Sequence, residues 1–499
     1  MAGSVSKAFK WSAVEQFGKQ GLRFVLSIVL ARLLSPSEYG LMGMLLVFLM
    51  IAQVFADSGL SAALVQRKEI CQDDETSVFY LNVAAGLVFA GLLCAISPVV
   101  AAFYHQPLLR PMLCVCSIGV FVSSLSIVQG ALLTRDVDFA TLAKVSLLAT
   151  IVSGVVGVAM AWKGFGVWSL VGQSIAQSVA SVVLIWLLRP WRPRGRFSLA
   201  RIRSMWHFSS RLLASGLLNT ICESSYALVI GKLYRPADLG FYTRASNLAM
   251  LPATSVQSMT GRVMMPIFAR MQDDKAQMKR EMRRTLRTLL GVFFPAMAGM
   301  AAVARPFVVC LLTAKWLPCV PYLRILCFAG MLYPLHAMQL DVLTAQGRSD
   351  LFLRLEVVKK VLTVSLVAAT FWLSVGALVG AVLANSVICL AINTYYTRKL
   401  ISYTVKEQAG DLVPVVAASL GMASAVFIAD ILLRKLAPWP LLAAEVAAGS
   451  VLYAVIVARF RKSAFADLWR QTARMWQWLA AAAVMPGAYM APSASNPIE

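Results

Sequence analysis

The sequence predicts an all-α polytopic membrane protein with about 14 transmembrane helices, arranged as two six-helix lobes in a parallel pseudo-twofold repeat plus two extra helices. Three observations predict this fold class. Of 499 residues, 59% are hydrophobic and 14% are charged, whereas a soluble chain carries about 25% charged residues. Apolar stretches of about 20 residues recur along the chain, and each is long enough to cross a hydrocarbon core of about 30 Å. A ten-residue motif also occurs twice, 200 residues apart, which is typical of a duplicated architecture.

The two copies of this motif span residues 31–40 and 231–240. Identical residues occupy three pairs of positions: Leu33 and Leu233, Pro36 and Pro236, and Gly40 and Gly240. In each copy an apolar segment is followed by a short turn with Pro and a closing Gly, and then by another apolar segment. Backbone groups that leave the helical hydrogen-bond ladder must find water at the membrane surface. We therefore expect each half of the chain to open with a helical hairpin.

The apolar segments predict the positions of the individual spans. Their ranges are 12–34, 40–64, 77–103, 111–133, 142–162, 166–189, 207–233, 240–268, 286–313, 321–345, 355–374, 376–398, 412–433 and 440–460. Lys and Arg concentrate in alternate connections between these spans, as the positive-inside rule requires of cytoplasmic loops. The most basic of them are 189–203 and 270–287. This alternation holds through all fourteen crossings only if both termini face the cytoplasm.

The arginine-rich connection 189–203 is the expected boundary between the two halves. The duplication continues beyond the hairpins, because the acidic pair at 73–74 recurs at 273–274 and Gln129 resembles Gln339. We therefore expect an N-lobe at 1–195, a C-lobe at 196–405, two extra helices at 406–462 and a cytoplasmic tail at 463–499. The segment 465–485 is tryptophan-rich and favours an interfacial helix over a fifteenth crossing, and residues 492–499 are expected to be disordered.

Several other function classes lack support in the sequence. The net charge of +23 lies in alternate loops, so it indicates membrane topology and not nucleic-acid binding. No P-loop motif is present for binding ATP. The nine cysteines form no CxxC pair and lie mostly in apolar segments, so neither a disulfide framework nor a zinc site is indicated, and no metal site is expected. Asp136 and Asp138 form a DxD pattern that could belong to a glycosyltransferase metal site, but a simple loop is the favoured interpretation.

Ionisable residues at membrane depth are the strongest functional signal, because they are costly there and tend to face cavities or partners. The first helix is the clearest case. Glu15, Lys19 and Arg23 are spaced four residues apart, which places them on one helical face. Exposing a charged helical face to lipid costs free energy, so we expect this face to point toward the protein interior. The alternative is a segment at headgroup level, whose Lys and Arg extend to the cytoplasm.

Further ionisable residues lie in other predicted spans, mostly in the two opening hairpins. Cations favour an anionic ligand, and phosphate is a usual partner of Arg. The expected anion-binding set of a central cationic cavity is Lys19, Arg23, Arg211, Arg244 and Arg262. The expected ion-coupling acids or charge partners are Glu15, Asp57, Glu223 and Asp341. Asp57 precedes Ser58 and Gly59, which could either loosen the helix or end it as a C-cap.

The chain resembles the Wzx-type polysaccharide transporters, in particular the colanic-acid flippase branch, within the multidrug/oligosaccharidyl-lipid/polysaccharide exporter superfamily. The matching segments are 10–12, 30–34, 38–40, 56–60, 66–69, 262–263, 266, 268–270, 272–274 and 315–316. The resemblance implies two six-helix lobes that work by alternating access. It also implies a flippase that moves undecaprenyl-pyrophosphate-linked oligosaccharide repeat units across the bacterial inner membrane.

The expected partners are the lipid-linked oligosaccharide and the bilayer, with a polysaccharide polymerase and chain-length proteins as candidate protein partners. No enzymatic activity and no cofactor beyond an H⁺ or Na⁺ gradient are expected. A multidrug or lipid II exporter of the same superfamily would have the same fold and is the main alternative. A membrane polysaccharide polymerase fits less well, because every connection assigned to the periplasm is short.

The predicted topology can be tested with reporter fusions. Fusions after Gly195 and after Lys315 should report opposite sides of the membrane, the first cytoplasmic and the second periplasmic, because an odd number of predicted spans separates them. Paired phosphatase and fluorescent-protein reporters measure this directly. The same side for both fusions would overturn the predicted number of spans.

Overall fold

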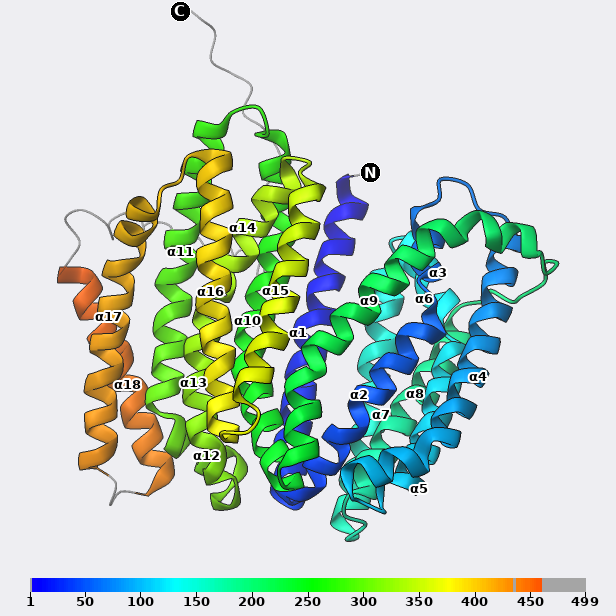
Figure 1. Cartoon of the computed structure of the whole chain (residues 1–499), viewed down its shortest axis with the longest axis horizontal. Helices are drawn as coiled ribbons and strands as arrows, with labels where there is room; N and C mark the ends of the chain where they lie inside the picture. The colour runs from blue at the N-terminus through cyan, green and yellow to red at the C-terminus, as the bar shows by residue number, and fades with distance from the viewer. Residues whose placement is uncertain (1, 434–436, 460–499) are drawn as a thin grey trace, which may run out of the picture. The chain divides into compact units, whose positions relative to one another are not determined.

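In the computed structural model, the described backbone covers residues 2–433 and 437–459, and side chains are described for these residues except 2–17, 254–263, 265–266 and 349–350. Within these ranges every regular element is a helix and no strand occurs. The fold class is therefore all-α, as predicted (Figure 1).

The described chain divides into two compact units. Unit 1 comprises 1–255, 304–330 and 350–389, and unit 2 comprises 256–303, 331–349 and 390–499, as far as the structure describes them. The helices of unit 1 are α1 (Ala2–Leu33), α2 (Pro36–Asp57), α3 (Leu60–Gln66), α4 (Gln72–Tyr104), α5 (Leu109–Ser124), α6 (Ile127–Arg135), α7 (Phe139–Trp162), α8 (Trp168–Leu188), α9 (Leu199–Leu233), α12 (Ala304–Leu312), the 3-10 helix η1 (Ala314–Cys319) and nearly all of α15 (Ser349–Thr370). Those of unit 2 are α11 (Lys275–Ala302), α14 (Tyr333–Ala345), α17 (Val405–Leu432) and α18 (Pro438–Arg459). The boundary between the units falls within α10 (Pro236–Arg270), α13 (Val320–Met331) and α16 (Val375–Ile401).

Eleven helical segments of the described chain are long and apolar enough to cross a membrane. Each of the fourteen predicted spans coincides with one helix or with two consecutive helices. The spans predicted at 12–34, 240–268 and 355–374 are helical but do not belong to the eleven. The chain is thus a multi-pass membrane protein, whereas the count of fourteen and the two-lobe arrangement stay predictions.

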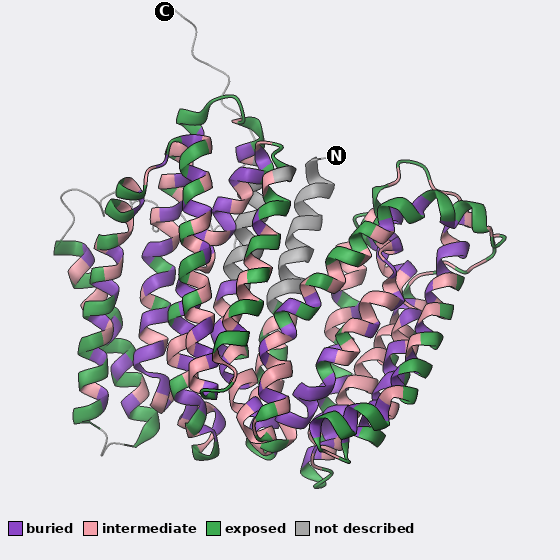
Figure 2. Ribbon diagram, in the orientation of Figure 1, coloured by how far each residue is buried: buried purple, intermediate pink, exposed green. Residues whose placement is uncertain are grey.

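Exposed residues lie along most helices (Figure 2). Many of them carry large apolar side chains, which fits a lipid environment. Val99 on α4, Val155 on α7 and Leu187 on α8 are 68%, 64% and 75% exposed. Exposed apolar surface of this extent marks contact with lipid or with a partner. Within unit 1, α4 packs on α5, α5 on α8, and α7 on α8 (Figure 1).

Four predicted spans are broken into two helices. The breaks lie between α2 and α3, between α5 and α6, between α11 and α12, and between α13 and α14. At the first break, Ser58 and Gly59 both adopt left-handed backbone conformations, with φ of 55° and 68°. Ser58 ends α2, and its hydroxyl donates to the carbonyl oxygen of Phe55 at 2.8 Å. Ser58 therefore ends α2 as a C-cap, and the same two residues interrupt the helix, so both interpretations of this segment describe one structural feature. Gln129 and Gln339, the related pair, lie fully buried in α6 and α14, each in the second helix of a broken span.

The two copies of the repeated motif pack against each other within unit 1. A methyl group at Gly40 would overlap the carbonyl oxygen of Pro236, and one at Gly240 would overlap that of Pro36. The contact is reciprocal, so each Gly accepts the backbone of the other turn. Only Gly allows two backbones to approach this closely.

Each turn is held by an acidic residue that caps the next helix. Glu38 accepts a hydrogen bond from the Ser35 backbone N–H at 2.6 Å, and Ser35 in turn caps α2. Asp238 accepts from the Arg235 backbone N–H at 3.2 Å in the second copy. Capping of this kind satisfies N–H groups that have no partner inside the helix. The acidic residue present in both copies of the motif thus stabilises the start of the following helix.

The end of α1 is joined to the segment after α12. Trp316 donates its indole N–H to the Ala31 carbonyl at 2.8 Å, and Lys315 donates to the Arg32 carbonyl at 2.7 Å. Arg32 donates back to the Leu311 carbonyl at 2.8 Å. Carbonyl groups at a helix C-terminus lack partners within the helix. Segments 30–34 and 315–316, noted separately in the sequence, therefore contact each other.

Replacing Gly40 by Ala should destabilise the protein, because a Cβ has no room against Pro236. Overpacking of this kind costs about 1–3 kcal/mol, so the unfolding midpoint of the purified protein should fall by about 1–3 °C. Gly91→Ala on α4 is the matched control, since nothing lies within 4 Å of its Cβ position. Fluorescence-detected thermal unfolding in detergent measures both variants. Equal midpoints for Gly40→Ala and Gly91→Ala would contradict the reciprocal contact.

Candidate functional site

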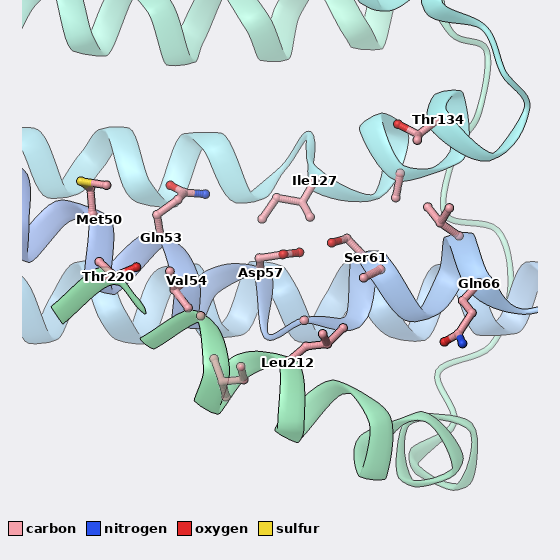
Figure 3. Close-up of a pocket in the computed structure, with 16 residues that line it drawn as sticks. Met50, Gln53, Val54, Asp57, Ser61, Gln66, Ile127, Thr134, Leu212 and Thr220 are labelled. Carbon is pink, nitrogen blue, oxygen red and sulfur yellow. The ribbon is translucent and has the colours of Figure 1, made fainter. Parts of the chain in front are cut away.

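A cavity of about 900 Å³ lies in unit 1, beside the break between α2 and α3 (Figure 3). Four helices contribute to its wall. The sixteen lining residues are Met50, Gln53, Val54, Asp57, Gly59, Ser61, Ala62, Val65, Gln66, Ile127, Ala131, Thr134, Leu212, Leu213, Gly216 and Thr220. The wall is mostly apolar with a few polar groups, the composition that small-molecule sites usually have.

The break in the helix positions this cavity. Gly59 allows the left-handed turn, and it also lets α9 approach closely. A Cβ on Gly59 would lie 2.7 Å from the carbonyl oxygen of Ser209. The turn therefore brings the end of α2, the start of α3 and the middle of α9 to one place. Discontinuous helices of this kind commonly form substrate and ion sites in transporters.

Asp57 is the one charged residue among the lining residues that the structure describes. Its side chain points toward Ser61 in the cavity, and both belong to the α2–α3 segment (Figure 3). Oδ1 of Asp57 is buried and has no hydrogen-bond partner within the described chain. The carboxylate lies at the N-terminal end of α3, where the helix dipole favours a negative charge. Asp57 can therefore cap α3 and still offer one oxygen to an ion.

The other polar groups of the cavity come from different helices. Gln53 of α2 accepts a hydrogen bond from the Ser123 hydroxyl at 2.9 Å. Thr134 of α6 and Thr220 of α9 also line the wall (Figure 3). Neutral donors and acceptors of this kind suit a polar, hydroxyl-rich ligand, because they can form hydrogen bonds without a net charge. Gln53 was not among the residues expected from the sequence.

The expected basic residues do not line this cavity. Arg23 and Arg211 are exposed, and Lys19 is half-buried. Arg211 is adjacent in sequence to the lining residue Leu212. Arg244 is 4% exposed and donates to the Ser27 carbonyl at 2.9 Å. The side chains of Glu15 and Arg262 lie outside the described residues.

Arg244 belongs instead to the packed cluster at the two hairpin turns. Its guanidinium lies 5.8 Å from the ring centre of Tyr39 and 5.9 Å from that of Trp316. These two rings are themselves in edge contact at 5.4 Å. Cations over aromatic faces are stabilised by the ring quadrupole, by about 0.5–2 kcal/mol. Arg244 also has a buried Nε–H without a hydrogen-bond partner among the described residues.

The remaining expected acids lie in separate environments. Glu223 is exposed on α9 and accepts from Asn219 at 2.8 Å. Asn219 also accepts a hydrogen bond from Lys360 of α15. Lys360 was not singled out from the sequence, although its place in a predicted span was a usable signal. Asp341 lies half-buried on α14 in unit 2 and has a buried Oδ2 without a partner in the described chain.

The DxD pattern has a structural explanation. Asp136 pairs with Arg189 at 2.7 Å. Asp138 caps α7 and accepts from the Thr141 backbone N–H at 3.1 Å. Desolvation raises the pKa of the Asp138 carboxyl, but the Thr141 hydrogen bonds and the Arg189 charge outweigh it, so the pKa is lower than usual. No group of three or more His, Cys, Asp or Glu side chains that could hold a metal occurs in the described part of the chain.

Together, the helical spans and the mostly apolar cavity beside a broken helix define a multi-pass membrane protein with a candidate ligand site inside one unit. The chain belongs to the polysaccharide biosynthesis protein family, whose profile matches residues 29–321. It is 26% identical over 353 residues to lipopolysaccharide biosynthesis protein WzxC of Escherichia coli (strain K12), covering 70% of this chain and 72% of that protein. It is 28% identical over 334 residues to succinoglycan biosynthesis transport protein ExoT of Rhizobium meliloti (strain 1021), covering 67% and 68%.

The fold is similar to that of a solved structure, lipid II flippase MurJ in an inward closed conformation. The TM-score is 0.74 with 12% sequence identity, and the match covers 90% of this chain and 98% of that one. At this identity the similarity concerns the fold alone. The resemblance to polysaccharide transporters expected from the sequence is confirmed.

Asp57→Asn separates a capping role from an ionic role. Asn also caps helices, so the variant should keep its unfolding midpoint while losing the carboxylate. If Asp57 carries one coupling charge, the variant loses about 2.3 kcal/mol of driving force per 100 mV of membrane potential. This loss lowers the substrate concentration ratio that transport can sustain across the membrane roughly 50-fold. Polysaccharide output of cells that carry the variant measures this effect.

The matched control is Asp138→Asn, which also keeps a capping side chain but lies outside the cavity. Its polysaccharide output should equal that of the original protein. Normal output from Asp57→Asn, at equal protein level, would show that Asp57 only caps the helix.

Proposed function

We propose that this protein is a flippase that translocates undecaprenyl-pyrophosphate-linked oligosaccharide repeat units across the bacterial inner membrane, for exopolysaccharide, capsule or lipopolysaccharide synthesis. The observation that carries the proposal is the cavity at the α2–α3 break, with Asp57 and a few neutral polar groups in its wall, in a chain of the polysaccharide biosynthesis protein family. One relative is itself named a succinoglycan biosynthesis transport protein. We propose that the substrate of the present protein is likewise a precursor of a polysaccharide.

The proposed topology has fourteen crossings with both termini in the cytoplasm and two six-helix lobes. The agreement of every predicted span with a helix or a broken pair supports it. The reciprocal packing of the two hairpin turns also supports it, since equivalent elements of a parallel repeat meet around a common axis.

The proposed mechanism is alternating access driven by an H⁺ or Na⁺ gradient. The sequence carries no P-loop, so transport would draw on an ion gradient or on the gradient of the substrate itself, and we propose the ion gradient. Asp57 supports this step, because one of its oxygens lies in a cavity at a broken helix and has no hydrogen-bond partner among the residues that the structure describes. The hydroxyl and amide groups of the cavity suit a sugar, which carries many hydroxyl groups.

The proposed headgroup contact is the cationic set Lys19, Arg23, Arg211, Arg244 and Arg262. A pyrophosphate that crosses a low-dielectric region needs compensating charge, and Arg remains charged at every physiological pH. The Nε–H of Arg244, which has no hydrogen-bond partner in the described part of the chain, supports this role for that residue. Contact with a headgroup would require Arg244 to become accessible, as alternating access allows.

A lipid II exporter is the second candidate, favoured by the fold similarity to the lipid II flippase. The two candidates differ in substrate and not in architecture. Multidrug export would fit the same fold. A membrane polysaccharide polymerase is less consistent, because the sequence offers no long connection for a catalytic domain outside the membrane.

The lipid-linked oligosaccharide profile of a strain without this protein tests the proposal. We expect accumulation of one undecaprenyl-linked repeat unit in the cytoplasmic leaflet and loss of the mature polysaccharide, because the unit is completed but not translocated. Leaflet-selective enzymatic labelling of the sugar measures its side. The complemented strain should return to the original profile.

Three results would contradict the proposal. Repeat units trapped in the periplasmic leaflet would indicate a polymerase. Accumulated lipid II would indicate a lipid II exporter. An unchanged lipid profile combined with greater sensitivity to cationic drugs would indicate a multidrug exporter.

A further inference from the structure

Two acidic residues lie buried between α17 and α18 in unit 2. These helices are adjacent in sequence and pack against each other (Figure 1). The side chain of Asp430 on α17 is fully buried, and Glu445 on α18 is 2% exposed. Both helices are candidate membrane spans. Ionisable groups in such positions are costly and tend to be functional.

The register of the two helices places these carboxyl groups at the same level. Gly449 of α18 faces Val426 of α17, since a Cβ on Gly449 would lie 3.1 Å from the Val426 side chain. Asp430 is one turn after Val426, and Glu445 is one turn before Gly449. The two helices run antiparallel, so one turn forward along α17 and one turn backward along α18 move in the same direction in space. Asp430 and Glu445 therefore lie at the same level of the interface. The two carboxyl groups also interact electrostatically.

None of the four carboxyl oxygens has a hydrogen-bond partner among the described residues. The charged groups of the neighbouring α11 are distant, because Arg283 and Arg287 pair with Asp411 at the other end of α17. Asp411 and Asp430 are separated by nineteen residues, or about 28 Å along a helix. Arg434 and Lys435, in the connection between α17 and α18, lie outside the described residues.

Two ionised carboxylates cannot share a buried site without compensation. Burying one unpaired carboxylate is already costly, and a second like charge beside it adds repulsion. One proton between the two groups removes one charge and supplies a hydrogen bond to the other carboxylate. A hard divalent cation takes six or more oxygen ligands, and this site offers four. A proton is therefore the ligand that the site fits.

We propose that Asp430 and Glu445 form a proton-binding site that holds one proton between their carboxyl groups at neutral pH. The site lies outside the cavity of Asp57, and neither residue is part of the proposed coupling set. It does not depend on the proposed transport function. Its effect is to let two acidic side chains pack between two membrane helices and to keep one exchangeable proton there.

Infrared spectroscopy of the protein in lipid nanodiscs tests the site, because a protonated carboxyl has a C=O stretch that a carboxylate lacks. At neutral pH the difference between the original protein and Asp430→Asn/Glu445→Gln should show the loss of one protonated carboxyl per chain. Asp411→Asn is the matched control on α17. It should leave this band unchanged, since Asp411 is ionised in its pairs with Arg283 and Arg287.

Two further measurements keep the proposal testable if the double variant does not fold. Raising the pH of the original protein into the strongly alkaline range should remove the same band reversibly. The double variant Arg434→Gln/Lys435→Gln should leave the band unchanged, because the bound proton, and not a basic side chain of the α17–α18 connection, offsets the charge of the two carboxyl groups. Absence of the band in the original protein, or its appearance only in Arg434→Gln/Lys435→Gln, would overturn the proposal in favour of an ion pair.

Discussion

The reciprocal contact between the turns at Gly40 and Gly240 is the constraint on which unit 1 depends. Each Gly lies against the backbone carbonyl of the Pro in the opposite turn, so neither turn tolerates a side chain there. The contact fixes where α1, α2, α9 and α10 begin or end relative to one another. Arg244, Tyr39 and Trp316 then pack beside it. The two copies of the motif thus form one packed cluster together with Arg244, Tyr39 and Trp316.

The break at Ser58 and Gly59 connects this packing to function. In a continuous helix all backbone groups would be hydrogen-bonded within the helix. Asp57 would then have no helix N-terminus beside it. The left-handed turn ends α2, starts α3 and allows α9 to approach Gly59. The result is a cavity with one carboxylate among mostly apolar and neutral polar groups. Such a site suits a ligand rich in hydroxyl groups together with a small cation.

The sequence predicted the all-α class, the helix positions and the family, because hydrophobic length and short motifs are local properties. It also indicated the break at Ser58, since Gly and Ser are visible signals there. It did not indicate that Asp430 and Glu445 lie buried at the same level of the α17–α18 interface, because this depends on the register between the two helices. Arg244 illustrates the same limit: its charge was evident, but its burial between Tyr39 and Trp316 follows from tertiary packing.

The central claim is that the cavity beside Asp57 contacts a lipid-linked oligosaccharide, and site-specific photo-crosslinking tests it most directly. A photoreactive amino acid at Thr220, which lines the cavity, should capture the undecaprenyl-linked repeat unit in living cells. The same probe at Val155, which is 64% exposed on α7, should capture bulk phospholipid and not the oligosaccharide. Capture of the oligosaccharide at Val155 alone, or at neither position with both proteins active, would contradict the account.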